Sequence, residues 1–317
     1  MSGAASATDG DFADLVAELR SRFASAADKP DETVESTAAA LWFKAADEPR
    51  AVSRARPPVP ALSIAQQGTL RELVARRLSG EPLAYLTGLQ EFLGLEFFAA
   101  PGALIPRRET ELVGRACLAV LQELSAGGAP LCVLDLCTGC GNLAIAMALQ
   151  APQARVYATD LEAAALAVAA RNLERHGLSS RVQLRQGDLF GALRAPGDAE
   201  ADAGLRFSLI ACNPPYLATR HATHMPVAVA GSEPVAAFDG GPFGLSIVLR
   251  LIREAPAHLP PGGWLCFEIG AGQQPIVDSR VAQNAGYTEI HRIRDEQGVV
   301  RAYQLRWDGA AGTGITP

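Results

Sequence analysis

The stretch Phe207-Ser208-Leu209-Ile210-Ala211-Cys212-Asn213-Pro214-Pro215-Tyr216 changes abruptly from apolar residues to polar and rigid ones. Its first six residues predict a buried strand, and the two prolines, which cannot donate to a ladder, predict that the strand ends at Asn213. In an open α/β sheet, ligands bind at the carboxyl ends of the strands. The Asn213 amide offers an acceptor and two donor hydrogens, and Tyr216 offers a flat face and a hydroxyl. The stretch therefore predicts a site for a planar group that carries an NH2, with a plain strand-terminating turn as the alternative.

From Leu131 onward the chain alternates short apolar runs with helical periodicity, which indicates a parallel sheet with helices between its strands. Near the C-terminus, two apolar runs flank Asp295-Glu296-Gln297-Gly298 and predict a final antiparallel pair. Strands are predicted at 131–136, 154–159, 182–186, 207–212 and 264–269, with the last pair at 287–293 and 299–305; helices are predicted at 142–149, 162–176 and around 245–252. The fold class is therefore α/β.

The part before residue 107 has a different character. Apolar residues at helical spacing, with Ser63 and Gln66 as a capping box, predict a small helical bundle over residues 1–88. Residues 89–106 predict a β-hairpin that acts as a connector. The bundle contains no recognisable chemistry, so it is interpreted as a scaffold or as a recognition surface for a protein substrate. Residues 107–308 form the predicted α/β domain, and 309–317 a disordered tail.

Composition restricts the classes of function. The 317 residues are 49% apolar and 20% charged, with a net charge of −6, which is ordinary for a globular protein and disfavours nucleic acid as the direct substrate. No secretory signal is recognisable, and no apolar run approaches the roughly 18 residues that span a bilayer. We expect a cytoplasmic protein without a membrane partner, and nothing in the sequence demands an oligomer, so a monomer is expected.

The cysteines and histidines do not form a recognisable metal site. Five of the six cysteines lie in or beside predicted core strands, which is typical of buried, reduced thiols. Cys137-x-x-Cys140 matches half of a zinc or redox motif, but no second pair lies at zinc spacing. His221-x-x-His224 lies in a polar loop without cysteines or clustered carboxylates. We therefore predict no metal.

Three successive strand ends predict a nucleoside site. Asp135-Leu136-Cys137-Thr138-Gly139-Cys140-Gly141 lets backbone N–H groups approach a ligand, and Asp160 can accept both hydroxyls of a ribose. In Gly187-Asp188-Leu189-Phe190, the carboxylate can accept from an adenine amino group. A third glycine that would complete a dinucleotide fingerprint is missing, so a nucleoside without phosphate, such as S-adenosylmethionine, fits better. The predicted cofactor residues are Cys137, Thr138, Gly139, Cys140, Gly141, Asp160, Asp188, Leu189 and Asn213.

Motifs spread over nearly the whole chain resemble one family. They are Gly80-Glu81-Pro82-Leu83-Ala84-Tyr85-Leu86-Thr87-Gly88, Leu104-Ile105-Pro106-Arg107, Glu109-Thr110-Glu111, the glycine loop, Asn213-Pro214-Pro215-Tyr216, Glu233-Pro234, Gly240-Gly241-x-x-Gly244-Leu245, Pro261-Gly262-Gly263-Trp264 and Glu268-Ile269-Gly270. With these motifs the chain resembles the HemK/PrmC family of protein-glutamine methyltransferases. Asn-Pro-Pro-Tyr is shared with DNA adenine methyltransferases, whereas the motifs around Pro82 and Pro106 are more specific.

The resemblance implies a Rossmann-like, class I S-adenosylmethionine-dependent methyltransferase domain with a seven-stranded, mostly parallel sheet. It also implies a protein substrate, with a peptide chain release factor favoured. Arg108 stands where the release-factor branch usually has proline, and Cys137 where it usually has glycine. Cysteine at that position is closer to the branch that modifies a large-subunit ribosomal protein, and Cys140 and Asn142 replace commoner small residues.

The resemblance assigns the chemistry to the strand end. The Asn213 side-chain oxygen and the Pro214 carbonyl are expected to accept the two N–H bonds of a substrate glutamine, while Pro215 and Tyr216 form the pocket wall. Asn213, Pro214 and Tyr216 are the predicted catalytic residues, and all four residues are predicted to bind substrate. Two alternatives remain: an adenine amino-methyltransferase that acts on a flipped base of a nucleic acid, and a non-catalytic paralogue that binds a protein partner.

Overall fold

The computed structural model describes residues 3–22, 31–193, 204–216, 240 and 244–309. These residues divide into two compact units, with the boundary between Pro101 and Gly102. The pair His221 and His224, the Glu233-Pro234 motif and all but the first residue of the predicted tail lie outside the described residues.

Unit 1, the part before the boundary, contains helices and one hairpin. Its elements are α1 (Gly3–Arg22), α2 (Val34–Ala45), α3 (Ile64–Leu78), α4 (Leu83–Thr87), β1 (Leu89–Phe92) and β2 (Leu95–Phe98). The predicted capping box is confirmed, because the Ser63 side chain accepts from Gln66 N while the Gln66 side chain accepts from Ser63 N. The predicted hairpin also forms, with Leu89 opposite Phe98.

Helix α2 is buried on more than one of its faces. It is buried from Ser36 to Phe43, because α1, α3 and α4 all pack against it. The run Ala38-Ala39-Ala40 makes this possible, since small side chains allow neighbouring helices to approach from several directions.

Unit 2, the part after the boundary, contains a seven-stranded sheet of order β5-β4-β3-β6-β7-β9-β8. Its strands are β3 (Cys132–Leu136), β4 (Arg155–Asp160), β5 (Val182–Gln186), β6 (Leu209–Cys212), β7 (Gly263–Glu268), β8 (Tyr287–Arg294) and β9 (Val300–Trp307). The first five strands of this order are parallel, and β9 pairs antiparallel with both β7 and β8. The predicted α/β class, parallel core and closing antiparallel pair are thus confirmed.

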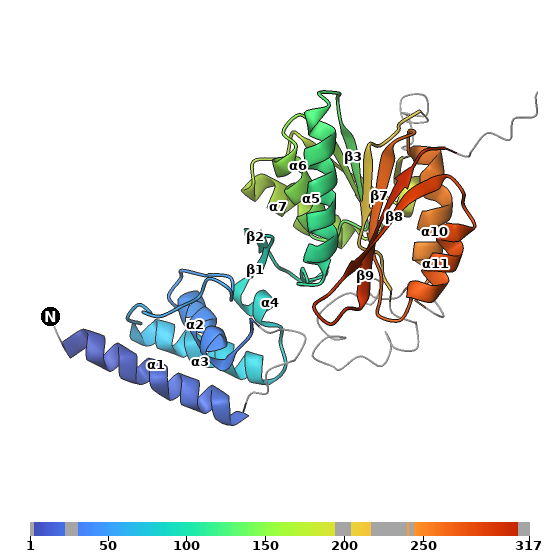
Figure 1. The fold of residues 1–317 in the computed structure, drawn as a ribbon. Coiled ribbons are helices and arrows are strands. Elements are labelled where there is room, and N and C mark those ends of the chain that lie inside the picture. Colours follow the sequence, from blue (N-terminus) through green and yellow to red (C-terminus); the bar gives the residue numbers. More distant parts are fainter. Residues whose placement is uncertain (1–2, 23–30, 194–203, 217–239, 241–243, 310–317) are drawn as a thin grey trace, which may run out of the picture. The chain divides into compact units, whose positions relative to one another are not determined.

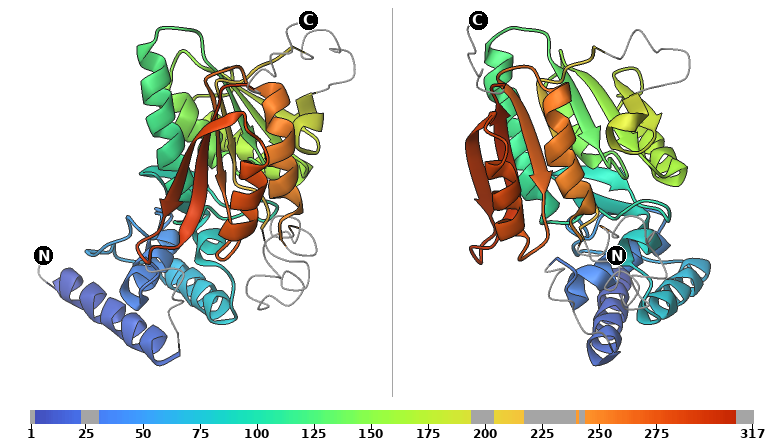
Figure 2. Two further views of the ribbon diagram at one scale, coloured as in Figure 1. Left: turned by 45° about the vertical axis from the view of Figure 1, so that its right-hand side comes forward. Right: turned by 90° about the vertical axis from the view of Figure 1, so that its right-hand side faces the viewer.

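Helices cover both faces of this sheet. Figures 1 and 2 show α5 (Thr110–Ala126), α6 (Asn142–Gln150) and α7 (Ala163–Arg175) on one face, and α10 (Ser246–Glu254) and α11 (Gln274–Ala282) on the other. Strand β6 is completely buried and lies in the middle of the sheet. The chain progresses from β3 to β4 in one direction and later adds β6 on the opposite side of β3, which creates a switch point at the carboxyl ends of these strands.

The strand register places the predicted motifs at one edge. Leu136 is paired with both Thr159 and Cys212, and Cys212 is paired with Phe267. The residues that follow these positions therefore emerge side by side at the carboxyl edge of the sheet.

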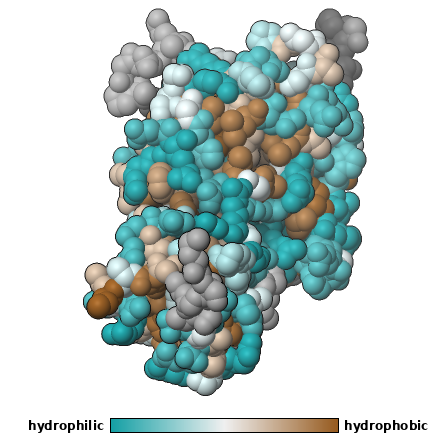
Figure 3. All heavy atoms as spheres, turned by 90° about the vertical axis from the view of Figure 1, so that its left-hand side faces the viewer, coloured by the Kyte–Doolittle hydropathy of each residue, from teal (hydrophilic) through white to brown (hydrophobic). Residues whose placement is uncertain are grey.

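Within the described ranges, no helix is both long enough and apolar enough to cross a bilayer. On the face shown in Figure 3, hydrophilic residues predominate and the hydrophobic residues form separate patches.

Candidate active site

A pocket of about 300 Å³ lies within unit 2 and collects residues from the ends of four strands, β3, β4, β5 and β6. Such a volume is at the lower end of the range for small-molecule sites. The predicted residues that line it are Cys137, Thr138, Gly139, Cys140, Asp160, Asp188, Leu189, Asn213 and Pro215. Leu104, Pro106 and Thr110, which precede or begin α5, also line it.

The other predicted residues, Gly141, Pro214 and Tyr216, are not among the lining residues. Gly141 is the N-cap of α6 and has a φ of 85°, in the left-handed region that favours glycine. The Tyr216 hydroxyl hydrogen-bonds to Glu268, and burial, together with the Glu268 carboxylate, raises the pKa of Tyr216. The Tyr216 carbonyl accepts from Gln273 Nε2 at 2.9 Å.

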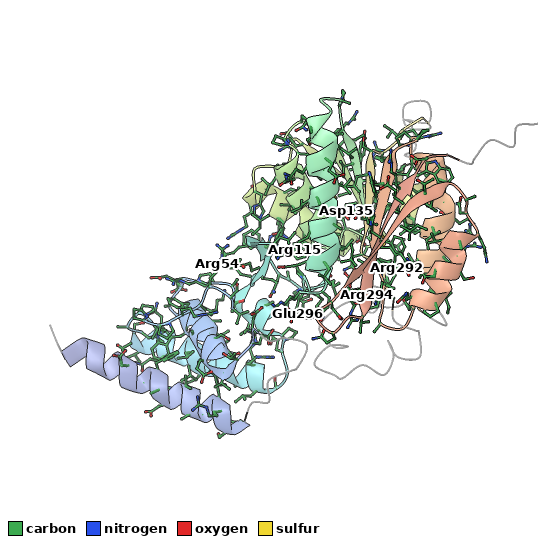
Figure 4. The ribbon with its side chains drawn as sticks, in the orientation of Figure 1. Arg54, Arg115, Asp135, Arg292, Arg294 and Glu296 are labelled. Atoms are coloured by element: carbon green, nitrogen blue, oxygen red, sulfur yellow. The ribbon has the colours of Figure 1, made fainter. Side chains whose placement is uncertain are left out.

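The glycine loop is tied to the sheet by the buried side chain of Asp135. Its Oδ2 accepts from Thr138 Oγ1 at 2.6 Å and from Ala144 N at 3.1 Å, while its Oδ1 has no hydrogen-bond partner among the described residues. Burial raises the pKa of Asp135 to about 7. Figure 4 shows Asp135 inside unit 2, in the sheet region behind α5. Its role here is to hold the loop in shape.

The loop itself adopts left-handed backbone conformations. Gly139 has a φ of 56°, and a Cβ added there would meet no atom within 4 Å, so the backbone faces open space. Cys137 has the same φ of 56° although it carries a side chain. Such a conformation is strained in a residue other than glycine and is concentrated at functional sites.

The Asp160 carboxylate is fixed at the floor of the pocket by backbone donors. Gly139 N donates to its Oδ2 at 2.8 Å, and Glu162 N donates to its Oδ1 at 3.0 Å. Burial raises the pKa of Asp160, and the two N–H groups oppose that shift. Both oxygens retain lone pairs that can accept hydrogen bonds from hydroxyl groups of a ligand.

The Asp188 carboxylate has a partner that sequence reasoning missed. Arg250 Nη1, on α10, lies 3.1 Å from its Oδ1 and 2.9 Å from its Oδ2. Next to it, Leu189 has a φ of 47°, and Gly187 cannot carry a Cβ, which would lie 2.7 Å from the Cα of Ala192. Close packing therefore shapes this turn. No local pattern in the sequence marks Arg250, because the ion pair joins positions 62 residues apart.

The Asn213 amide is held by groups that were quoted only as parts of motifs. Its Nδ2 donates to Thr110 Oγ1 at 3.1 Å. Thr110 begins α5 and is 1% exposed. Its side chain also hydrogen-bonds to Glu268, the last residue of β7, which is 2% exposed. Burial raises the pKa of Glu268 to about 7, and its hydrogen bonds to Thr110 and Tyr216 oppose that shift.

The cysteines are all free thiols. Burial raises the pKa of the Cys140 thiol to about 12, which makes it unreactive near neutral pH. Across the described part of the chain, no three His, Cys, Asp or Glu side chains are grouped so that they could hold a metal ion.

A sheet of this order, with a pocket at its switch point, defines a class I methyltransferase fold. Comparisons with known proteins agree: residues 113–230 match the methyltransferase small domain, and residues 14–88 match the PrmC N-terminal domain.

Three relatives are named release factor glutamine methyltransferase. The one from Geobacter sulfurreducens is 40% identical over 73% of this chain and 75% of its own. Those from Moorella thermoacetica and Bordetella pertussis are 37% and 42% identical, over 83% and 75% of this chain and 87% and 82% of theirs. The chain belongs to the release factor glutamine methyltransferase family, which confirms the resemblance inferred from its motifs.

Replacing Asp135 by asparagine should remove one source of pH dependence from folding stability. Because its pKa is raised from 3.8 to about 7, the folded state keeps this carboxyl protonated where the unfolded state releases the proton. The contribution of the group to stability is therefore full below about pH 4 and is lost as the pH rises towards about 7. The total loss is on the order of 4 kcal/mol.

The measurement is the free energy of unfolding in urea for the wild-type protein and for Asp135→Asn at about pH 5 and about pH 8. The wild-type protein should lose more stability than the variant between the two conditions. Equal losses in the two proteins would contradict the assignment.

Proposed function

We propose that this protein transfers a methyl group from S-adenosylmethionine to the side-chain amide nitrogen of a glutamine in a peptide chain release factor. The observation that carries the proposal is the orientation of the Asn213 amide at the pocket. Its Nδ2 is engaged by Thr110, so its Oδ1 remains available to accept an N–H bond from a substrate. Membership in the family supports the choice of substrate.

The pocket fits S-adenosylmethionine in its donor set and in its apolar surface. The Asp160 carboxylate, held by Gly139 N and Glu162 N, is suited to accept the two hydroxyls of a ribose. Leu161 is 57% exposed although it lines the pocket, so a bound nucleoside would cover an apolar side chain that water now contacts. When bound, the cofactor supplies a methyl group on a positively charged sulfur.

In this proposal the Asp188 carboxylate has two partners, Arg250 and the adenine amino group. Both of its oxygens already face Arg250 Nη1, and the side chain is 55% exposed. A carboxylate has about four acceptor sites, so the ion pair leaves room for an adenine amino group. Arg250 then orients Asp188 while Leu189 lies beside the base.

Methylation of a glutamine amide depends more on orienting its nitrogen towards the methyl donor than on acid–base chemistry. The amide nitrogen is a weak nucleophile because its lone pair is delocalised into the carbonyl group. Asn213 Oδ1 and the Pro214 carbonyl accept its two N–H bonds and direct the lone pair toward the methyl donor. Each hydrogen bond contributes about 1 kcal/mol of net binding, so most of the rate gain comes from positioning. The proton leaves the nitrogen readily after transfer, so no catalytic base is required.

The identity of the protein substrate can be tested directly. The purified protein is mixed with labelled S-adenosylmethionine and, separately, with release factors, large-subunit ribosomal proteins, RNA and DNA. Label on one glutamine of a release factor, located by mass spectrometry, is the expected result. Label on a ribosomal protein would redirect the proposal to the other branch of the family, and label on a nucleic acid would refute it. A cytoplasmic, monomeric enzyme is part of this proposal.

Replacing Asn213 by alanine should lower kcat at least 100-fold, because the substrate amide loses the acceptor that orients it. The dissociation constant for S-adenosylmethionine should change less than about 5-fold, since the Asp160 and Asp188 contacts remain. Steady-state kinetics and calorimetry measure the two quantities. Gln153→Ala, which removes an exposed amide that does not line the pocket, is the control. Normal turnover by Asn213→Ala would rule out the mechanism.

Replacing Asp160 by asparagine should weaken cofactor binding by roughly 10- to 100-fold. The variant loses the charge that strengthens a ribose hydrogen bond, and such bonds contribute about 1.5–3 kcal/mol. Calorimetric titration with S-adenosylmethionine checks this. The same substitution at Asp278, which pairs with Arg292 on another part of unit 2, is the control and should leave binding unchanged. An unaltered affinity in Asp160→Asn would contradict the ribose assignment.

A further inference from the structure

A chain of hydrogen bonds runs from the Asn213 amide to a buried carboxyl group, and the mechanism described above uses only its first bond. It starts at Asn213 Nδ2, which donates to Thr110 Oγ1 at 3.1 Å, and continues from Thr110 to the Glu268 carboxyl group. Thr110 and Glu268 are 1% and 2% exposed, so their hydrogen bond is shielded from bulk water. These hydrogen bonds connect the start of α5 with the ends of β6 and β7.

Which group donates in each of these hydrogen bonds follows from the donors and acceptors that the Thr110 hydroxyl and the Glu268 carboxylate can offer. A threonine hydroxyl carries one hydrogen, and an ionised carboxylate can only accept. The hydrogen bond of Thr110 lowers the pKa of Glu268 and so favours the ionised carboxylate. To that form Thr110 donates its hydrogen, which leaves only a lone pair for Asn213. That lone pair selects the NH2 end of the Asn213 amide and turns Oδ1 away from Thr110. The arrangement matches the orientation that the structure shows.

Glu268 itself is in an unfavourable place for a carboxyl group. Its burial raises its pKa to about 7, with Glu109 adding to that shift and Arg301, Thr110 and Tyr216 opposing it. An apolar side chain at the end of β7 would avoid this desolvation cost. What an apolar side chain would lack is an acceptor for the hydroxyls of Thr110 and Tyr216.

We propose that Thr110 and Glu268 are positioning residues that fix the Asn213 amide with its Oδ1 toward the substrate glutamine. The inference rests on the proposed role of Asn213 as the acceptor for the substrate amide. Without the Thr110 hydroxyl, the productive orientation leaves the partly buried Asn213 NH2 without its partner, which costs up to about 1–3 kcal/mol. Neither orientation of the amide is then selected by a partner, and the reversed amide presents donors to a substrate that also presents donors.

The first test compares Thr110→Val with Thr110→Ser. Valine keeps the shape of threonine and removes the hydroxyl, so kcat should fall roughly 10- to 100-fold while KM for the protein substrate changes little. Serine retains the hydroxyl and should stay within about 3-fold of the wild-type rate. The dissociation constant for S-adenosylmethionine should be unchanged in both. Thr288→Val, which removes an exposed hydroxyl bound to Asp308, is the matched control.

The second test asks whether Glu268 acts through Thr110. Glu268→Gln keeps an acceptor oxygen, and because Glu268 Oε2 has no hydrogen-bond partner among the described residues, the new NH2 can take its place without facing a donor. This variant should retain most of the rate, whereas Glu268→Met should lose as much as Thr110→Val. The double variant Thr110→Val with Glu268→Met should be no more than about 3-fold slower than Thr110→Val alone. Multiplied losses would show independent roles and overturn the inference.

The outcomes separate this inference from the proposed function. If Asn213→Ala turns over normally, the proposed mechanism itself fails. If Asn213→Ala is inactive but Thr110→Val has the wild-type rate, the positioning role alone fails. A Thr110→Val protein that has lost affinity for S-adenosylmethionine would also overturn the inference, because the hydroxyl would then support the fold of the pocket rather than the orientation of one amide.

Discussion

The end of β6 is the constraint on which the site depends. A completely buried apolar strand stops at a polar side chain, and the next two residues are prolines that have no N–H groups. The backbone there can accept hydrogen bonds through the Pro214 carbonyl but cannot donate them. The two prolines therefore offer no donor to the Asn213 side-chain oxygen, and Thr110 is the group that the structure places against the amide.

Two buried carboxyl groups flank β6, one on each neighbouring strand. Asp135 on β3 holds the glycine loop through Thr138 and Ala144 N, and Glu268 on β7 holds the hydroxyls of Thr110 and Tyr216. Burial raises the pKa of both to about 7. Raised pKa values at a site are commonly interpreted as evidence of acid–base catalysis. Here each carboxyl group is hydrogen-bonded to protein hydroxyls, and amide methylation needs no base. We therefore interpret Asp135 and Glu268 as groups that hold the neighbouring segments in place, and not as catalytic acids or bases.

The sequence predicted the parts of this structure that are local. Strand periodicity, the glycine loop and the residues that follow each strand lie within a few positions of one another, and parallel pairing then brings them to one edge. The pairs Asn213–Thr110 and Asp188–Arg250 join residues 103 and 62 positions apart and leave no periodic signal. The burial of α2 on most of its surface was missed for a related reason, because it depends on neighbours that pack from several sides.

The departures from the release-factor pattern can now be placed in three dimensions. Cys137 lines the pocket with its thiol hydrogen-bonded to Cys212, and the Cys140 thiol donates to Asn142 within the buried start of α6. None of these side chains holds the Asn213 amide, which depends on Thr110. Arg108 is exposed beside the start of α5. Cys137, Cys140 and Asn142 therefore alter how the glycine loop packs against its own sheet, and they do not weigh against a release factor as the substrate.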